Sequence, residues 1–270
     1  MQISSAAGLQ KVQGLQKNNK FLSKIYERMA TGKKINRASD DAAMMAVAKE
    51  LESMTRGFQQ SSSNIGDALS ALRIAEGAGN EISAMKQRQG ELAIQASNGT
   101  LKDTDRAALN QEYQQLNEEI NRIAESTQFN RQNLTNGESP LSDGSGQVQS
   151  GPNSGDSRTL GEIDFSNLAT GDISTIDGAQ AAITSSKDEL QALTATRAGI
   201  GAEMNGLSSA QRNVDNANVN TTEALSRAVD LDYAQASMDK ARGDILSQSS
   251  TASLGNFNSI NKANMNALLS

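Results

Sequence analysis

The sequence predicts a mainly α-helical protein, in which long antiparallel helices form a coiled-coil bundle with a small irregular, β-hairpin tip. Two stretches, residues 44–82 and 176–214, carry apolar residues alternately three and four positions apart. This spacing averages about 3.5 residues per turn and keeps one narrow apolar seam on a helix. A helix of the first stretch extends about 60 Å, so it requires a partner of similar length. Aromatic residues are only 3% of the chain, which favours thin helix-on-helix seams over a thick core.

Composition excludes several kinds of functional site. The chain contains neither Cys nor His. It therefore has no disulfide, no thiolate metal site, no cysteine nucleophile and no histidine base. We accordingly expect no enzyme activity, no metal and no cofactor. No apolar run approaches 18 residues, and the first residues lack the apolar segment of a cleaved signal peptide, so we expect no membrane span and no such signal.

The net charge of -6 conceals a basic N-terminal segment. Residues 1–37 hold eight Lys and Arg residues against Glu27 alone, a net charge of +7. Such a segment is typical of contact with nucleic acid or a membrane surface. However, no base-stacking aromatic residues alternate with these charges. We therefore favour a solvated helix face or a contact with acidic neighbours.

Residues 1–40 and 229–270 are predicted to form one terminal helical domain, because each end carries a thin apolar stripe without another partner. Gly32 ends the first helix, since glycine readily adopts the left-handed conformation after a helix terminus. We expect the two stripes to meet and to become ordered only when another segment packs on them. Their residues are Val12, Leu15, Leu22, Ile25, Met29, Leu231, Met238 and Ile245.

Residues 41–228 are predicted to form a second helical domain, whose two long stretches pack antiparallel. A shorter helix from about Asp103 doubles back beside the first long helix. Residues 131–173 are expected to form the exposed tip, because residues 139–159 contain six Ser, four Gly and both Pro residues. The main residues of the coiled-coil seam are Val47, Leu51, Met54, Phe58, Ile65, Leu72, Leu190, Leu193, Ile200, Met204 and Leu207.

At both ends the sequence resembles bacterial flagellin. The resemblance is carried by ERMATGKKINRASDDAAMMAVAKEL at 27–51, by Gln128-Phe129-Asn130, and by Asp232-Tyr233-Ala234. It implies paired termini in an inner tube, where the residues of the two terminal stripes provide the packing between subunits. It also implies that the central helices are stacked around this tube as a second layer. The variable outer domains of the family are absent here. The resemblance further implies a secreted, extracellular subunit that self-assembles into the helical filament used for swimming. Its implied partners are other copies of the chain, an export chaperone, the filament cap and the hook-junction proteins, and neither nucleic acid nor a membrane.

Two alternative functions remain open at this stage. Met44-Met45 and the ending GNFNSINKANMN depart from the usual pattern, which leaves a hook–filament junction protein as the alternative within the family. From another class, the basic segment permits a coiled-coil nucleic-acid-binding protein. Some flagellins carry a zinc protease with a His-Glu-x-x-His helix, which a chain without histidine cannot form.

The resemblance also marks three positions at which a vertebrate Toll-like receptor recognises many flagellins. The matching residues are Arg88, Leu92 and Glu112, and all three keep the residue type of the family. Gly90 stands where a basic residue is common. The alternative is that these three are ordinary surface and packing residues.

Overall fold

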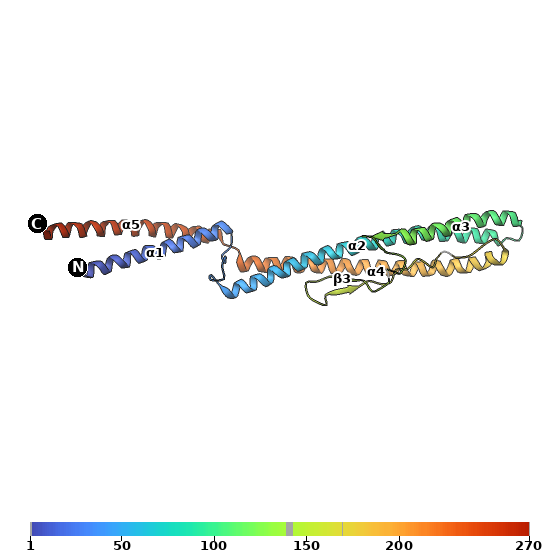
Figure 1. Cartoon of the computed structure of the whole chain (residues 1–270), viewed down its shortest axis with the longest axis horizontal. Helices are drawn as coiled ribbons and strands as arrows, with labels where there is room; N and C mark the ends of the chain where they lie inside the picture. The colour runs from blue at the N-terminus through green and yellow to red at the C-terminus, as the bar shows by residue number, and fades with distance from the viewer. Residues whose placement is uncertain (1, 139–142, 169, 270) are drawn as a thin grey trace. The chain divides into compact units, whose positions relative to one another are not determined.

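The computed structural model describes residues 2–138, 143–168 and 170–269, and over these ranges it confirms the mainly α-helical fold (Figure 1). The described helices are α1 (Gln2–Thr31), α2 (Ala42–Ala96), α3 (Asp103–Ser126), α4 (Ile176–Val229) and α5 (Tyr233–Leu269). Four short strands form two antiparallel pairs, β1 (Gln128–Phe129) with β2 (Gln132–Asn133) and β3 (Gln147–Gln149) with β4 (Ser157–Thr159). Among the described helices, none is long and apolar enough to cross a membrane.

Helix ends follow local signals in the sequence. Gly32 has a φ of 70° directly after α1, as expected for the residue that stops a helix. The Asp41 carboxylate accepts the backbone N–H of Met44 at 2.9 Å and so caps the start of α2. At the start of α4, the Thr175 hydroxyl accepts the N–H of Gly178 at 3.0 Å in the same way.

The chain divides into two compact units. The terminal unit comprises residues 1–53 and 220–270, and the middle unit comprises residues 54–219. The first boundary, at residue 53 in α2, lies 13 residues after the predicted boundary at residue 40. The second boundary, at residue 220 in α4, lies nine residues before the predicted boundary at residue 229. The physical reason is a small apolar cluster in which Ala48 of α2 packs against Ala228 and Val229 of α4.

In the terminal unit, α1 and α5 run side by side and antiparallel (Figure 1). Lys11, near the start of α1, donates from Nζ to Ser253 Oγ at 2.9 Å in the second half of α5. At the other end of the pair, the Tyr233 hydroxyl donates to the Met29 carbonyl at 2.6 Å. The expected pairing of the two chain ends is thus present.

Asp40 organises the loop between α1 and α2. Its Oδ2 accepts the backbone N–H groups of Asn36 at 3.3 Å and Arg37 at 3.2 Å, while Lys24 lies 3.3 Å from Oδ1. The backbone N–H groups of Arg37 and Asn36 lower the pKa of the Asp40 carboxyl, with a smaller contribution from Lys24. The charged form of Asp40 therefore favours the folded loop.

In the middle unit, α2 and α4 pack antiparallel, as the matched seams predict. Gln211 of α4 donates from Nε2 to Ser62 Oγ of α2. Further along α2, Glu76 accepts from Arg197 Nη2 at 2.7 Å. Residue numbers rise along α2 as they fall along α4, which fixes the direction. Helix α3 completes the bundle by contributing Ile120 and Ala124 to the same core.

The predicted seam residues differ in burial. Those at the centre of the seam are fully buried, namely Ile65, Leu72, Leu193, Ile200 and Leu207. A second group is partly buried, namely Leu51, Met54, Phe58, Leu190 and Met204. The prediction for Val47 is wrong, because this side chain is 46% exposed. The neighbouring Ala48 is the residue of this turn that faces α4.

The segment between α3 and α4 is not the exposed tip that its composition predicts. It contains the expected hairpins, but Leu160, Ile163 and Phe165 are buried in the core formed by α2 and α4. Val148 of β3 joins them at 7% exposure. The Ser- and Gly-rich stretch ends at residue 159. The apolar residues Leu160, Ile163 and Phe165 follow it and have enough apolar surface to dock on the helices. Residues 139–142 lie outside the described ranges.

Candidate assembly surface

The contact between α1 and α5 is narrow, because α5 presents small residues to α1. Leu22 and Ile25 of α1 are buried at 8% and 4% exposure. On α5 the buried positions are Ala236 and, seven residues on, Gly243. A Cβ atom at Gly243 would lie 2.5 Å from Leu22 Cδ2. A larger residue at this position would force the Leu22 side chain to move, so glycine lets the two helices pack closely with Leu22 in its observed conformation.

This geometry corrects the predicted C-terminal stripe. Met238 is 51% exposed and Ile245 is 66% exposed, so within one chain they do not pack against α1. Each lies two residues beyond a buried position, and two residues correspond to about 200° around a helix. Large side chains were expected to face α1, but the close approach at Gly243 selects small ones. Leu231 is partly buried.

The N-terminal stripe is also only partly used within the chain. Leu22 and Ile25 are covered, whereas Leu15 and Met29 are partly buried. Val12 is 40% exposed. A role of all these residues in packing between subunits stays a prediction, because the structure contains one chain.

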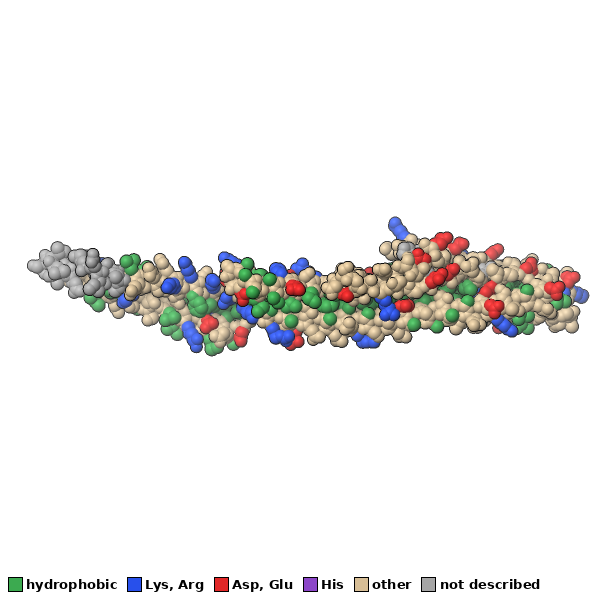
Figure 2. Space-filling view, turned by 90° about the horizontal axis from the view of Figure 1, so that it is seen from below, with side chains coloured by type: hydrophobic (Ala, Val, Ile, Leu, Met, Phe, Trp, Pro, Cys, Tyr) green, Lys and Arg blue, Asp and Glu red, His purple; other side chains and the backbone are tan. Residues whose placement is uncertain are grey.

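Among its described residues, the terminal unit exposes more large hydrophobic side chains than it buries. Of fifteen large hydrophobic side chains that are exposed among the described residues, eleven belong to this unit. They are Leu9, Val12, Phe21, Tyr26, Met44, Val47, Tyr233, Met238, Ile245, Leu246 and Ile260. Figure 2 shows hydrophobic side chains, in green, at the surface on one face of the molecule. Its fully buried hydrophobic residues number seven in the same ranges, and three of them are alanines. Extensive exposed apolar surface marks a site of protein–protein contact.

Several charges of the basic N-terminal segment are paired within the chain. Glu27 accepts from Arg37 at 3.0 Å, and Lys11 Nζ lies 5.1 Å from the centre of the Phe257 ring. The ion pair agrees with the interpretation of the basic segment as a helix face with acidic neighbours, and the contact with Phe257 adds a cation–π interaction that the sequence did not predict.

On the facing helix, Lys240 joins Tyr26 of α1 to Asp244 of α5. Its Nζ lies 5.5 Å from the centre of the Tyr26 ring and 3.1 Å from Asp244 Oδ2. The hydrogen bond to Asp244 is the main cause that raises the pKa of Lys240. The rim of the α1–α5 contact is therefore polar, while its outer faces are apolar.

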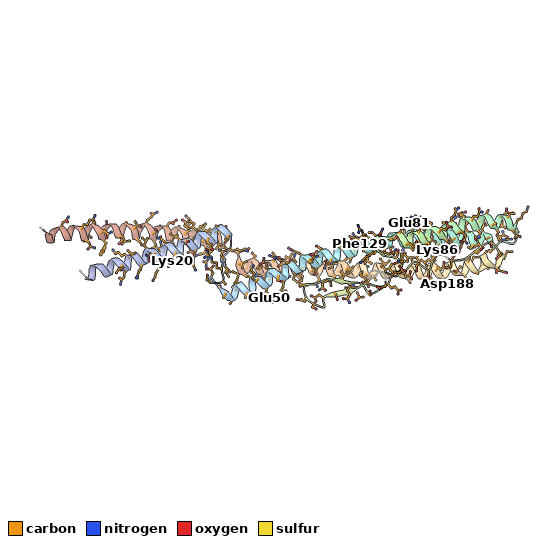
Figure 3. The ribbon with its side chains drawn as sticks, in the orientation of Figure 1. Lys20, Glu50, Glu81, Lys86, Phe129 and Asp188 are labelled. Carbon is orange, nitrogen blue, oxygen red and sulfur yellow. The ribbon has the colours of Figure 1, made fainter. Side chains whose placement is uncertain are left out.

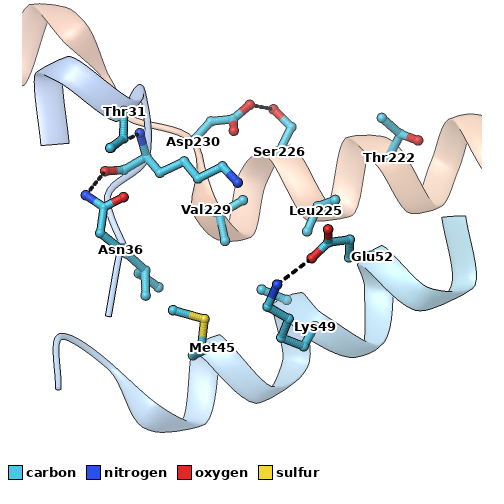
Figure 4. A pocket seen from close by; sticks show the side chains of 13 residues that line it. Thr31, Asn36, Met45, Lys49, Glu52, Thr222, Leu225, Ser226, Val229 and Asp230 are labelled. Carbon is cyan, nitrogen blue, oxygen red and sulfur yellow. Dashed lines mark hydrogen bonds and ion pairs between the residues drawn. The ribbon is translucent and has the colours of Figure 1, made fainter. Parts of the chain in front are cut away.

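A pocket of about 680 Å³ lies in the terminal unit beside the loop that follows α1 (Figure 4). Its polar side chains pair with one another around it: Lys49 with Glu52 at 2.8 Å, and Ser226 with Asp230 at 2.5 Å (Figure 4). Its apolar lining comes from Ile35, Met45, Ala48, Leu225 and Val229. This arrangement provides a recess for apolar side chains and no set of converging catalytic groups.

The three positions matched to receptor recognition do not form one exposed patch. Arg88 donates from Nε to Glu112 Oε1 at 2.9 Å and from Nη1 to Glu91 Oε2 at 3.1 Å. The hydrogen bond to Glu112 is the main cause that raises the pKa of Arg88. Leu92, in contrast, is completely buried against α3 and α4. Its expected role as a receptor contact is wrong in this packing, because a partner cannot reach the side chain.

Sequence reasoning missed a set of buried polar residues in the middle unit. Lys86 and Gln89 of α2 are 1% and 0% exposed, and Asn117 of α3 is 7% exposed. Gln89 Nε2 donates to Asn117 Oδ1 at 2.7 Å. A signal was available, because the alternation of three and four residues, continued past Ile82, falls on Lys86 and Gln89.

Both ends of the chain match family models. Residues 4–140 match the bacterial flagellin N-terminal helical region, and residues 173–268 match the bacterial flagellin C-terminal helical region. The chain belongs to the bacterial flagellin family. Within this family it is similar to the flagellin of Halalkalibacterium halodurans, with 40% identity over 241 residues that cover 87% of each chain.

Two other comparisons agree with this family, and the first is with a relative of similar length. The flagellar filament core protein flaB2 of Brachyspira hyodysenteriae is 34% identical over 259 residues, covering 90% of this chain and 91% of the relative. The crystal structure of Bacillus cereus flagellin is 31% identical, with a TM-score of 0.51, and the match covers 56% of this chain and 88% of that one. The recognition drawn from the sequence is confirmed, including the absence of large outer domains.

Proposed function

We propose that this chain is a structural subunit that assembles with copies of itself into a bacterial flagellar filament. The observation that carries the proposal is the apolar surface of the terminal unit, where large side chains lie exposed on both helices. A single chain gains nothing from exposing them, whereas an assembly buries them in every subunit. The family relationship agrees, since relatives of the same length are named as flagellin and filament core protein.

The proposed mode of assembly is an open helix of identical subunits. In this mode the exposed residues of α1 in one subunit pack against those of α5 in the next, so one subunit offers a contact that differs from the contact it receives. Such a heterologous contact that does not close into a ring generates a filament. In the filament, Val12, Leu231, Met238 and Ile245 take part in packing between subunits of the inner tube.

The cellular setting follows from the same proposal. A filament subunit acts outside the cell and is exported before it assembles. We therefore propose an export chaperone, the filament cap and the hook-junction proteins as further partners. The support for these partners is the family relationship.

Polymerisation of the purified protein tests the proposal. Short filament fragments added as seeds to monomer should elongate, and electron microscopy and sedimentation should detect the filaments. Binding to existing ends without elongation would instead indicate a junction protein. Filaments held by apolar contacts should persist as salt is added, whereas a complex with nucleic acid should weaken steeply.

A further inference from the structure

The apolar seam of the middle unit does not by itself determine how far α2 is shifted along α4. On α2 the large residues Phe58, Ile65 and Leu72 follow one another at intervals of seven. On α4 the residues Leu193, Ile200, Leu207 and Val214 do the same. A shift of seven residues, about 10 Å, would match large residues with large residues again. Another interaction must therefore select the observed register.

Lys86 and Glu189 form a pair that exists in one register only. The Lys86 side chain has no exposed surface, and its Nζ contacts the Glu189 carboxylate across the α2–α4 contact. Nζ also donates to the Leu168 carbonyl at 2.6 Å. Lys86 lies in the part of the middle unit where α2, α3 and α4 run together (Figure 3). After a shift of seven residues, Lys86 would face Ala182 or Thr196, and neither carries a carboxylate.

The segment that enters α4 is hydrogen-bonded to the same pair. Glu189 Oε1 accepts the hydroxyl of Thr170 at 2.5 Å and that of Ser185 at 2.8 Å. The Thr170 carbonyl in turn accepts the hydroxyl of Tyr113 on α3 at 2.9 Å. One buried ion pair thus connects α2, α3, α4 and the entering segment.

We propose that Lys86 and Glu189 fix the register between α2 and α4. An ammonium group at a site without exposed surface is costly unless a carboxylate and further acceptors meet it. A shift of seven residues in either direction leaves Lys86 opposite Ala182 or Thr196, without a carboxylate partner. The pair therefore determines which register forms, as single buried polar residues do in coiled coils. Replacing both charged groups by uncharged ones of similar size should permit several registers.

Cysteine crosslinking of the full-length chain measures the register directly, because the natural sequence has no Cys. Ser62→Cys with Gln211→Cys reports the native register, since these two side chains are in contact. Ser62→Cys with Asn218→Cys reports a shift of seven residues. The reagent is a thiol crosslinker with a span below the shift of about 10 Å. Each cysteine pair is placed in the natural background and in Lys86→Met/Glu189→Gln.

In the natural background we expect only the Ser62–Gln211 pair to crosslink. In Lys86→Met/Glu189→Gln the helix content should persist, the native crosslink should fall at least twofold, and the shifted crosslink should appear. The matched control is Arg88→Met/Glu112→Gln, which removes the same charges from a half-exposed pair between α2 and α3. This control should keep the crosslinking pattern of the natural chain.

Two results would overturn the proposal. One is an unchanged native crosslink in the double variant, which would show that the remaining contacts select the register. The other is loss of helix content in the double variant by circular dichroism. That result would mean that the pair is needed for the helices to form at all, and not for choosing between registers.

Discussion

Substitution of Ile245 by aspartate separates the stability of the chain from the stability of its assembly. Fully burying an isoleucine side chain contributes about 1.5–3 kcal/mol. Ile245 is 66% exposed in the single chain, so only about a third of that value, roughly 0.5–1 kcal/mol, is lost on substitution. Isoleucine and aspartate have similar helix propensities, which adds only about a few tenths of a kcal/mol. Helix content and melting temperature should therefore change little.

In an assembly that covers this face of α5, the same substitution buries a carboxylate without a partner. That burial costs several kcal/mol, and the cost recurs in every subunit. Ile245→Asp should therefore abolish elongation from seeds while leaving the monomer folded. Circular dichroism reports the monomer, and sedimentation with electron microscopy reports the polymer.

Ile200→Asp provides the matched control, because Ile200 is 2% exposed in the core of the middle unit. There the carboxylate is buried already in the single chain, so the melting transition itself should be lost or strongly lowered. Normal filaments from Ile245→Asp would refute the assignment of this face to subunit contacts.

Four further outcomes are expected. Phe165→Ala should lower the free energy of unfolding by about 3–5 kcal/mol, measured by urea titration, because the ring is completely buried. Gly171→Ala should lower the melting temperature more than Gly155→Ala. Both glycines have positive φ, but only a Cβ at Gly171 meets an atom, 3.0 Å from the hydroxyl of Tyr113. The pKa of Asp40 is lowered in the folded chain, so its carboxylate stabilises the fold at pH values above the unfolded pKa of about 4. This stabilisation is lost as the pH falls through the pKa of the folded chain. The melting-temperature difference between the natural chain and Asp40→Asn should accordingly shrink in acid. Limited proteolysis should cut α1 and α5 before the middle unit, and equal protection of both units would contradict this.

The sequence predicted the middle unit better than the terminal unit, and the reason lies in the size of the packed residues. The seam between α2 and α4 is built from large residues with a regular spacing, so its centre could be identified from periodicity. The α1–α5 contact instead depends on Gly243 and Ala236, which no apolar pattern distinguishes from surface positions. Because large apolar side chains were expected to form the contact, the sequence predicted Met238 and Ile245, which lie on another face of α5.

The buried polar residues were missed for a related reason. Lys86 interrupts an apolar stripe and reads as the solvent side of a helix, although its position continues the seam. Its burial depends on Glu189 and on a carbonyl from the segment before α4, which are about a hundred residues away in sequence. A single sequence does not show which distant groups meet. The docking of Phe165 on the α2–α4 core was missed for the same reason, since a low-complexity stretch precedes it.

The same difference in residue size explains how one chain can be stable alone and still assemble. The middle unit places its large side chains inside, so its folding does not depend on neighbouring subunits. In the terminal unit, α5 presents small side chains to α1, and eleven large hydrophobic side chains among the described residues stay exposed. If α5 presented Met238 and Ile245 to α1, the pair would be more stable alone but would have less apolar surface left for other copies. The close approach at Gly243 thus keeps the apolar side chains of α5 available for contacts that only an assembly can complete.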